Sequence, residues 1–419
     1  MDRAESPQEP GTRLRGADPG SAPHPDGADD DRRVDALMNK VLIHTMERRI
    51  SDFPVPAHRW PRSVAALLVG LALPCAAPAT ADPAPPAPAE QRFTLRVGYQ
   101  PYFAEAWSGA VLRAQHLHAD RLPRDVGVEF KVGMTGAGAL MSALRQGDVD
   151  LAYLGLAPTL VVSQDTGRGD FRIIAVSSVS RRLCNVVLAQ AGADVSSRQA
   201  ALHWLDGRTV SVPRGSCADL FLADVLEQGN VQPARVLDQG FDVLATSFRE
   251  HRVDAVAVWE PIASDLIRTA NAVRLVDGDS VGETSAAFLV ATAALLRDHP
   301  DVVRGWLDAE RAAQQVLARS TERSLPIDAL AGQAVDFPKE SLSAAWSGPR
   351  HSGAWTSPAS FPFIVTPDVT AILTHAAKRM AHRRLLASPT LRPGSVDDSS
   401  ARAILAAAHD SGATPRGGP

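Results

Sequence analysis

From Phe93 onward, short apolar segments alternate with longer segments in which apolar residues recur every three or four positions. The short segments predict strands, whereas a spacing of three to four residues is typical of an amphipathic helix. Strands are expected at 93–99, 126–134, 150–156 and 171–179, helices at 106–120 and 138–147, and a short helix or loop at 159–167. Strands separated by helices predict βαβ units, a mostly parallel sheet and an α/β fold class.

The same alternation starts again near residue 183. It predicts strands at 183–190, 209–213 and 253–259, and helices at 197–207, 217–229 and 241–251. Helical spacing returns in 300–320 and 367–386, with an irregular loop at 347–363 between them. The chain is thus expected to hold two α/β units followed by helices, and residues 388–419, rich in Pro, Gly and Ser, to form a disordered tail.

Two segments share one order of features: a helix end, a turn, a Val-Asp pair, an apolar strand and a loop closed by proline. They are Leu144–Pro158 (LRQGDVDLAYLGLAP) and Phe248–Pro261 (FREHRVDAVAVWEP). This echo indicates two similar lobes, although chance similarity between βα units would produce it equally well. Both loops follow the carboxyl end of a predicted strand, where open α/β sheets bind ligands.

The longest apolar run, Val64–Leu73, is too short for the roughly 20 residues of a membrane-spanning helix. Arg59 and Arg62 precede it, and Ala79-Thr80-Ala81 offers the small residues that a signal peptidase accepts. We therefore expect a signal peptide, cleavage before Asp82 and export, either to the periplasm or to another place outside the cytosol. A short buried helix is the alternative.

The flanks of this segment follow from that interpretation. Residues 1–62 are expected to be a disordered leader or the product of a start site placed too early. The signal peptide core and its cleavage site occupy 63–81, and a Pro/Ala linker follows at 82–91.

Charge and cysteine content restrict the partners and the compartment. The formal net charge is -4, and the basic residues are scattered among acids, so a nucleic-acid partner is not favoured. After cleavage, Cys184 and Cys217 remain of the three cysteines. An even number in an oxidising compartment is consistent with one disulfide. Two buried free thiols are the alternative, because the sequence does not fix the Cα separation of about 5.5 Å typical of a bridge.

Motifs typical of catalysis or cofactor binding are absent from the sequence. It contains no nucleophile elbow, no P-loop and no Gly-rich dinucleotide loop, and its 12 histidines are dispersed without metal-ligand spacing. We therefore expect a protein that is not an enzyme and that holds no cofactor and no metal.

Two loops between a predicted strand and a predicted helix could bind an anion. Thr135–Gly138 and Pro213–Cys217 contain glycine, which lets the backbone approach a ligand, and the free N–H groups of a helix start attract negative charge. Simple helix capping by Thr135 or Ser216 is the alternative.

Aromatic and acidic side chains follow two other predicted strands. Tyr102 and Trp107 come after the first strand, and Trp259 and Glu260 follow the last strand of the second unit. The rings are expected to form a wall of the cleft and Glu260 to make a charged contact. Packing at a hinge for Trp259 and a solvated carboxylate at Glu260 are the alternatives.

Five segments in this order resemble solute-binding proteins of the nitrate/sulfonate/taurine ABC importer family: LRVGYQPY, MTGAGALMSALRQGDVDLAYLGLAP, VPRGSCADLFLADVL, RVDAVAVWEP and LLRDHPDVVRGWL. The resemblance covers roughly 93–318. It implies the type II periplasmic-binding-protein fold, with two α/β lobes joined by a two-strand hinge. Lobe 1 would comprise 92–180 plus 285–385, and lobe 2 would comprise 181–284.

The resemblance also implies ligand contacts in the loops already described, and the residue patterns add Trp107 and Asp219. The full set of candidates is Gln100, Tyr102, Trp107, Thr135, Gly136, Gly155, Ser216, Cys217, Asp219, Trp259 and Glu260. Cys217 stands where the family often has Ser or Thr, which puts a hydroxyl contact there in doubt.

The function implied is an exported, monomeric component of an ABC importer that closes on a small polar solute and delivers it to a permease and its ATPase. Opposed helix starts favour a sulfonate, nitrate or carboxylate, whereas Glu260 and Asp219 favour a ligand that also carries an amine, such as an aminosulfonate or an amine-bearing heterocycle. A periplasmic sensor lobe is one alternative. A pyrimidine-precursor synthase is another, disfavoured because Lys131, Lys339 and Lys378 all lie outside the cleft loops.

Overall fold

The computed structural model describes residues 93–132, 137–165, 169–320, 324–334, 336–347 and 357–412. The predicted leader, signal peptide and linker lie outside these described residues. Within them, no helix has both the length and the apolar character needed to cross a membrane.

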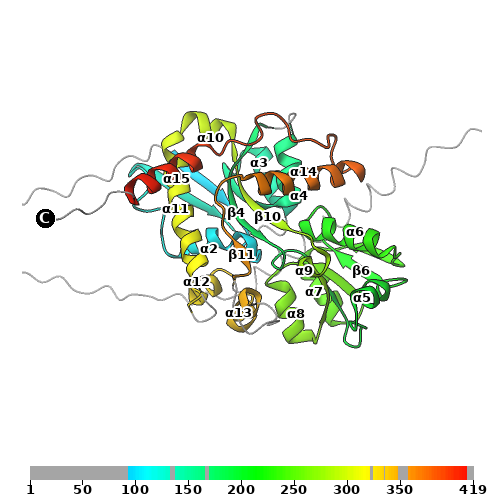
Figure 1. Ribbon diagram of the computed structural model, residues 1–419. Helices are drawn as coiled ribbons and strands as arrows, with labels where there is room; N and C mark the ends of the chain where they lie inside the picture. Colours follow the sequence, from blue (N-terminus) through cyan, green and yellow to red (C-terminus); the bar gives the residue numbers. More distant parts are fainter. Residues whose placement is uncertain are drawn as a thin grey trace, which may run out of the picture. The chain divides into compact units, whose positions relative to one another are not determined.

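Two β-sheets organise the chain (Figure 1). The first has the order β11-β4-β10-β3-β1-β2 and contains β1 (Phe93–Gly98), β2 (Val126–Lys131), β3 (Leu151–Gly155), β4 (Phe171–Ser180), β10 (Ser285–Thr292) and β11 (Ala359–Ser360). The second has the order β7-β6-β8-β5-β9 and contains β5 (Val186–Ala189), β6 (Thr209–Val212), β7 (Arg235–Asp238), β8 (Ala255–Val258) and β9 (Val273–Asp277).

The two sheets share one strand arrangement. In β2-β1-β3-β10-β4 and in β7-β6-β8-β5-β9, the fourth strand runs antiparallel to both neighbours. That strand is in each case the first one after a crossing from the other sheet. The prediction of mostly parallel sheets missed it, because the spacing of apolar residues does not encode strand direction. Strands β3 and β8, which carry the sequence echo, occupy equivalent positions, so the echo reflects related lobes.

Helices cover both faces of the first sheet, with α2 (Trp107–Ala114) and α11 (Pro300–Arg319) on one side of β4 and β10 (Figure 1). The other side is covered by α3 (Ala137–Gln146), α4 (Leu156–Gln164) and α14 (Pro367–His382). Side chains alternate accordingly along β3: Leu151 and Tyr153 pack with α2 and α11, and Ala152 and Leu154 pack with α3, α4 and α14.

The remaining helices complete the two lobes and the C-terminal region. They are η1 (Ala104–Ala106), α5 (Arg198–Trp204), α6 (Cys217–Gly229), α7 (Phe241–Arg249), α8 (Ile262–Ala270), α9 (Gly278–Val281), α10 (Ala293–Asp298), α12 (Ile327–Ala331), α13 (Lys339–Ser347) and α15 (Ser399–Gly412).

The two crossings between the sheets, 181–185 and 278–284, lie side by side. The N–H of Gly278 donates to the carbonyl oxygen of Asn185 at 3.0 Å. A Cβ atom on Gly278 would overlap the carbonyl oxygen of Arg181, so the close approach of the two segments requires glycine here.

C-terminal helices contact the second lobe at two further places. On α13, Ser341 donates from its Oγ to Asp265 of α8 at 2.9 Å. On α14, Arg379 pairs with Asp224 of α6 and, at 2.7 Å, with Glu283 of the second crossing. The C-terminal region therefore holds the lobes together beside the crossings.

The prediction of a disordered tail at 388–419 was wrong for its described part. Residues Ser399–Gly412 form α15, which packs next to α11 and buries Ala401 completely (Figure 1). Asp398 anchors the segment by accepting from the N–H of Val365 at 2.8 Å. The polar composition of the flanks obscured the short apolar stripe that includes Ile404 and Leu405.

Candidate functional site

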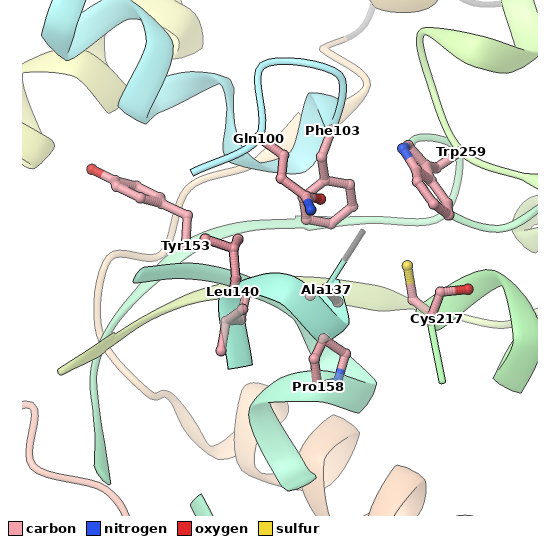
Figure 2. A pocket seen from close by; sticks show the side chains of 11 residues that line it. Gln100, Phe103, Ala137, Leu140, Tyr153, Pro158, Cys217 and Trp259 are labelled. Carbon is pink, nitrogen blue, oxygen red and sulfur yellow. The ribbon is translucent and has the colours of Figure 1, made fainter. Parts of the chain in front are cut away.

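A cavity lies between the lobes, where the loops after β1, β3 and β8 meet the first turns of α3, α4 and α6 (Figure 2). The cavity is small, about 30 Å³, and it opens to solvent. Its lining residues are Gln100, Phe103, Ala137, Leu140, Tyr153, Leu154, Gly155, Pro158, Ser216, Cys217 and Trp259. Because both lobes contribute, the cavity depends on how they are held relative to each other.

Aromatic rings from the two lobes meet at this cavity. Phe103 of the first lobe and Trp259 of the second pack edge to face, with ring centroids 6.4 Å apart. The indole N–H of Trp259 donates across the lobes to the carbonyl oxygen of Tyr102 at 2.9 Å. None of the described lining residues carries a charged side chain, so the walls offer mainly apolar contact.

Helix starts supply the polar character of the cavity. Gly155 is the N-cap of α4, Ala137 opens α3, and Ser216 caps α6 from the second lobe. The Oγ of Ser216 accepts from the N–H of Asp219 at 3.2 Å and donates to the carbonyl oxygen of Pro213 at 2.7 Å. The hydroxyl therefore caps the start of α6. Backbone N–H groups at helix starts carry partial positive charge and suit an anionic group.

The floor of the cavity is fixed by buried hydrogen bonds. Tyr153 donates its phenolic O–H to Glu310 at 2.6 Å, and Gln314 donates to the same carboxyl at 2.8 Å. Burial raises the pKa of the Glu310 carboxyl above its ordinary value, and it raises the pKa of the Tyr153 phenol well above its ordinary value of 10. Tyr153 therefore contributes the side of its ring to the cavity, while its hydroxyl points into the core (Figure 2).

Cys217 also lines the cavity, and it forms a disulfide with Cys184 across a Cα separation of 6.6 Å. Cys184 is fully buried in the first crossing. The sequence left open a disulfide or two buried free thiols, and the structure has the disulfide.

Glu260 and Asp219 were predicted as ligand contacts, but both form ion pairs within the protein. Glu260 is 1% exposed; it accepts from Arg274 at 2.6 Å and from the N–H of Ser264 at 2.9 Å. Asp219 accepts from Arg214 at 3.0 Å and does not line the cavity. Since both carboxylates already pair with an arginine of the protein, neither one calls for an amine on the ligand.

Two predicted aromatic contacts lie beside the cavity rather than in its wall. Trp107 is fully buried, donates to the carbonyl oxygen of Pro101 at 2.9 Å and stacks on Trp346 with centroids 5.7 Å apart. Tyr102 packs on Phe241, with centroids 5.2 Å apart. Burial, followed by the nearby carboxylates of Asp336 and Asp242, raises the pKa of the Tyr102 phenol.

Of the other predicted contacts, Gln100, Gly155, Ser216, Cys217 and Trp259 line the cavity, and Thr135 and Gly136 lie outside the described residues. Sequence reasoning did not select Phe103, Leu140, Tyr153, Leu154 or Pro158 as ligand contacts. Phe103 belongs to the aromatic run after the first strand, which was expected to lie over the cleft, but it was not chosen as a contact. The other four lie within strands and helices and look like core, and their only signal was their place next to the predicted loops. Within the described part of the chain, no group of three His, Cys, Asp or Glu side chains could hold a metal ion.

Part of the chain matches a known protein family. Residues 125–323 match the family model described as NMT1/THI5 like. No curated protein sequence matches the chain significantly.

Solved structures share the fold. The alkanesulfonate-binding protein SsuA from Xanthomonas axonopodis pv. citri, bound to MOPS, is 24% identical over 73% of this chain and 98% of its own, with a TM-score of 0.56. The periplasmic nitrate-binding protein NrtA from Synechocystis PCC 6803 is 14% identical over 77% of this chain and 90% of its own, with a TM-score of 0.57. The desulfurization enzyme DSZB is 15% identical over 76% of this chain and 100% of its own, with a TM-score of 0.56. The predicted periplasmic-binding fold is confirmed, and the same fold also supports an enzyme.

Proposed function

Because the chain carries an NMT1/THI5-like domain on the fold of sulfonate- and nitrate-binding proteins, we propose that it is the solute-binding component of an ABC importer. Its ligand is a small organic anion with an apolar substituent, such as an alkyl or aryl sulfonate. The protein is exported, captures this solute and delivers it to a permease with its ATPase.

The observation that carries the proposal is the lining of the cavity between the lobes. Phe103, Trp259 and Pro158 offer apolar surface to the body of a ligand, and the starts of α4 and α6 offer backbone N–H groups to an anionic head. Nitrate would leave the aromatic walls unused, and an amine would find no carboxylate among the described lining residues.

Capture follows from the shared construction of the cavity. A ligand that contacts both lobes stabilises the arrangement in which they meet, and it shifts the population by its difference in affinity between open and closed forms. The crossings 181–185 and 278–284 would act as the hinge.

Two features argue against an enzyme on this fold. Cys217, a nucleophile by residue type, is held in a disulfide. Lys131 pairs with Glu129 at 2.6 Å, and Lys339 pairs with Asp328, both away from the cavity lining.

Calorimetric titration of the purified protein with MOPS, pentanesulfonate, benzenesulfonate, taurine and nitrate tests the ligand class. Sulfonates with an apolar body are expected to bind more tightly than taurine or nitrate. Stronger binding of nitrate or taurine, or no binding by any sulfonate, would contradict the proposed ligand class.

Replacing Trp259→Ala tests the wall contributed by the second lobe. The change removes an apolar face worth about 1.5–3 kcal/mol when buried, so sulfonate affinity is expected to fall by about 10- to 100-fold. Trp204→Ala is the matched control, because Trp204 lies on α5 under Arg208, away from the cavity lining. Equal affinities of the two variants would remove Trp259 from the site.

A further inference from the structure

The Cys184–Cys217 disulfide stands at the junction of the ligand cavity and the crossings between the lobes. Cys217 lines the ligand cavity and also a second, smaller space of about 10 Å³, whose other lining residues include Asn185, Glu283 and Ser285. Those residues belong to the two crossings or to the strand that follows the second one. The first residue of α6 thus faces the ligand cavity on one side and the crossings between the lobes on the other.

Cys184 is a fixed point within the first crossing. On its two sides, the carbonyl oxygens of Leu183 and Asn185 accept from the N–H groups of Glu260 at 2.7 Å and Gly278 at 3.0 Å. The disulfide therefore fastens the start of α6 to a segment that is itself held by the backbone of the second lobe and of the second crossing.

The start of α6 also touches the first lobe. A Cβ atom placed on Gly155 would lie 3.6 Å from the Sγ of Cys217 and 3.2 Å from the ring of Phe103. With so little room, a shift of Cys217 changes the wall at the point where the lobes meet. Loss of the disulfide would free this first turn, whose N–H groups face the proposed anionic head.

We propose that the Cys184–Cys217 disulfide positions α6 for ligand capture and makes capture redox-dependent, with tight binding only while the bond is formed. The inference rests on the proposed function for the role of the cavity. It assigns to Cys184, which does not line the cavity, a positioning role exerted through Cys217.

Reduction would proceed through the cavity. Cys217 is 7% exposed and Cys184 is fully buried, so the thiolate of a dithiol reductant attacks Cys217 and expels the Cys184 thiolate, which takes up a proton. The second thiol of the reductant then breaks the mixed disulfide, which releases the Cys217 thiol and the oxidised, cyclic reductant. A solute in the cavity blocks this approach, so reduction of the bond is slower while the solute is bound.

This coupling would confine capture to an oxidising compartment. Thiols are kept reduced in the cytosol, and disulfides form after export. A newly made chain would therefore bind its solute weakly until it leaves the cytosol.

The first test titrates MOPS into the full chain, in a Cys75→Ser background, before and after reduction with dithiothreitol. Reduction is expected to weaken binding at least about fivefold, within the usual range of coupling between sites. Cys184→Ser is expected to bind as weakly as the reduced protein and to be insensitive to dithiothreitol, although it leaves every cavity residue in place. Unchanged affinity after complete reduction would overturn the proposal.

The second test needs no ligand. Amide hydrogen exchange in the first turn of α6 is expected to speed up on reduction, while exchange in α11, on the other lobe, stays the same. Unchanged exchange in α6 would refute the positioning role. If none of the sulfonates binds the oxidised protein but α6 loosens on reduction, the proposed ligand class fails and the positioning role stands.

The third test measures how fast dithiothreitol reduces the disulfide with and without MOPS, by alkylation and mass spectrometry. Saturating MOPS is expected to slow reduction, whereas sodium chloride at equal ionic strength is not. Equal rates would show that the bond is not reached through the cavity and would overturn this route of reduction.

Discussion

Two glutamates lie equally deep on opposite sides of the contact between the lobes, and their surroundings differ. Glu105 belongs to η1 of the first lobe, and Glu260 follows β8 of the second; each is 1% exposed. A backbone hydrogen bond of 3.0 Å from Ala104 to Glu260 joins the two segments. Glu260 has the guanidinium of Arg274 and the N–H of Ser264 as donors.

Glu105 has much weaker support. Its Oε2 accepts from the Oγ of Ser285 at 3.1 Å, and its buried Oε1 makes no hydrogen bond within the described residues. Burial raises the pKa of Glu105 to about 8, and the bond from Ser285 offsets only part of that rise. A buried carboxyl without a cation keeps its proton because the charged form loses its hydration. Residue type and depth therefore do not decide charge at this boundary; the partner does.

The largest effect is expected when the paired side loses its cation. Arg274→Ala would leave the buried Glu260 carboxylate without a cation, and breaking such a pair typically costs about 3–5 kcal/mol of unfolding free energy. Urea denaturation at neutral pH measures the loss. Arg297→Ala is the control, because Arg297 pairs with Asp298 on the surface, where such pairs contribute about 0–1 kcal/mol. Adding Glu260→Gln to Arg274→Ala should restore part of the lost unfolding free energy. A loss below about 1 kcal/mol in Arg274→Ala would show that buried Glu260 does not depend on its arginine.

Glu105, the glutamate without a cation, is expected to make the unfolding free energy depend on pH. The folded pKa of Glu105 is about 8 against an ordinary value of 4.5, so its contribution to stability is fully present below about pH 4.5 and is lost as pH rises through 8. Relative to Glu105→Gln, the wild type should lose up to about 1.4 kcal/mol per pH unit in this window. Urea denaturation at a series of pH values tests this; Glu129→Gln, on exposed β2 surface, should give no such slope. Parallel curves for wild type and Glu105→Gln would refute it.

The smallest effects on stability are expected when the serines that donate to the two glutamates are replaced, because one donates from its side chain and the other from its backbone. Ser285→Ala removes the hydroxyl that donates to Glu105, which is expected to cost about 0.5–1.5 kcal/mol and to raise the pKa of Glu105 further. Ser264→Ala keeps the N–H that donates to Glu260, so a smaller loss is expected. Thermal unfolding of both variants provides the measurement, and an equal or larger loss in Ser264→Ala would reverse this part of the comparison.

Local sequence patterns predicted the elements better than the contacts. The helix expected at 217–229 is observed at Cys217–Gly229, because helical spacing and its serine cap are encoded within a few residues. The role of Glu260 was misjudged because its partner Arg274 lies on β9, and sequence distance does not show that β8 and β9 flank the same strand, β5. Trp107 was assigned to the cleft for the same reason, since its stacking partner Trp346 comes from the distant α13.

The end of the chain has a consequence for solubility. Strand β4 would present an open edge on one side, and three separate pieces of the C-terminal region pair with it: β11, Phe363 opposite Val176, and Val396 beside Ile173. Open edges invite strands of other molecules to add on, which is a common route to aggregation. The pieces of chain after residue 357 that pair with β4 do not line the ligand cavity. Their effect is to cover an edge of the first sheet, which protects the first lobe from self-association.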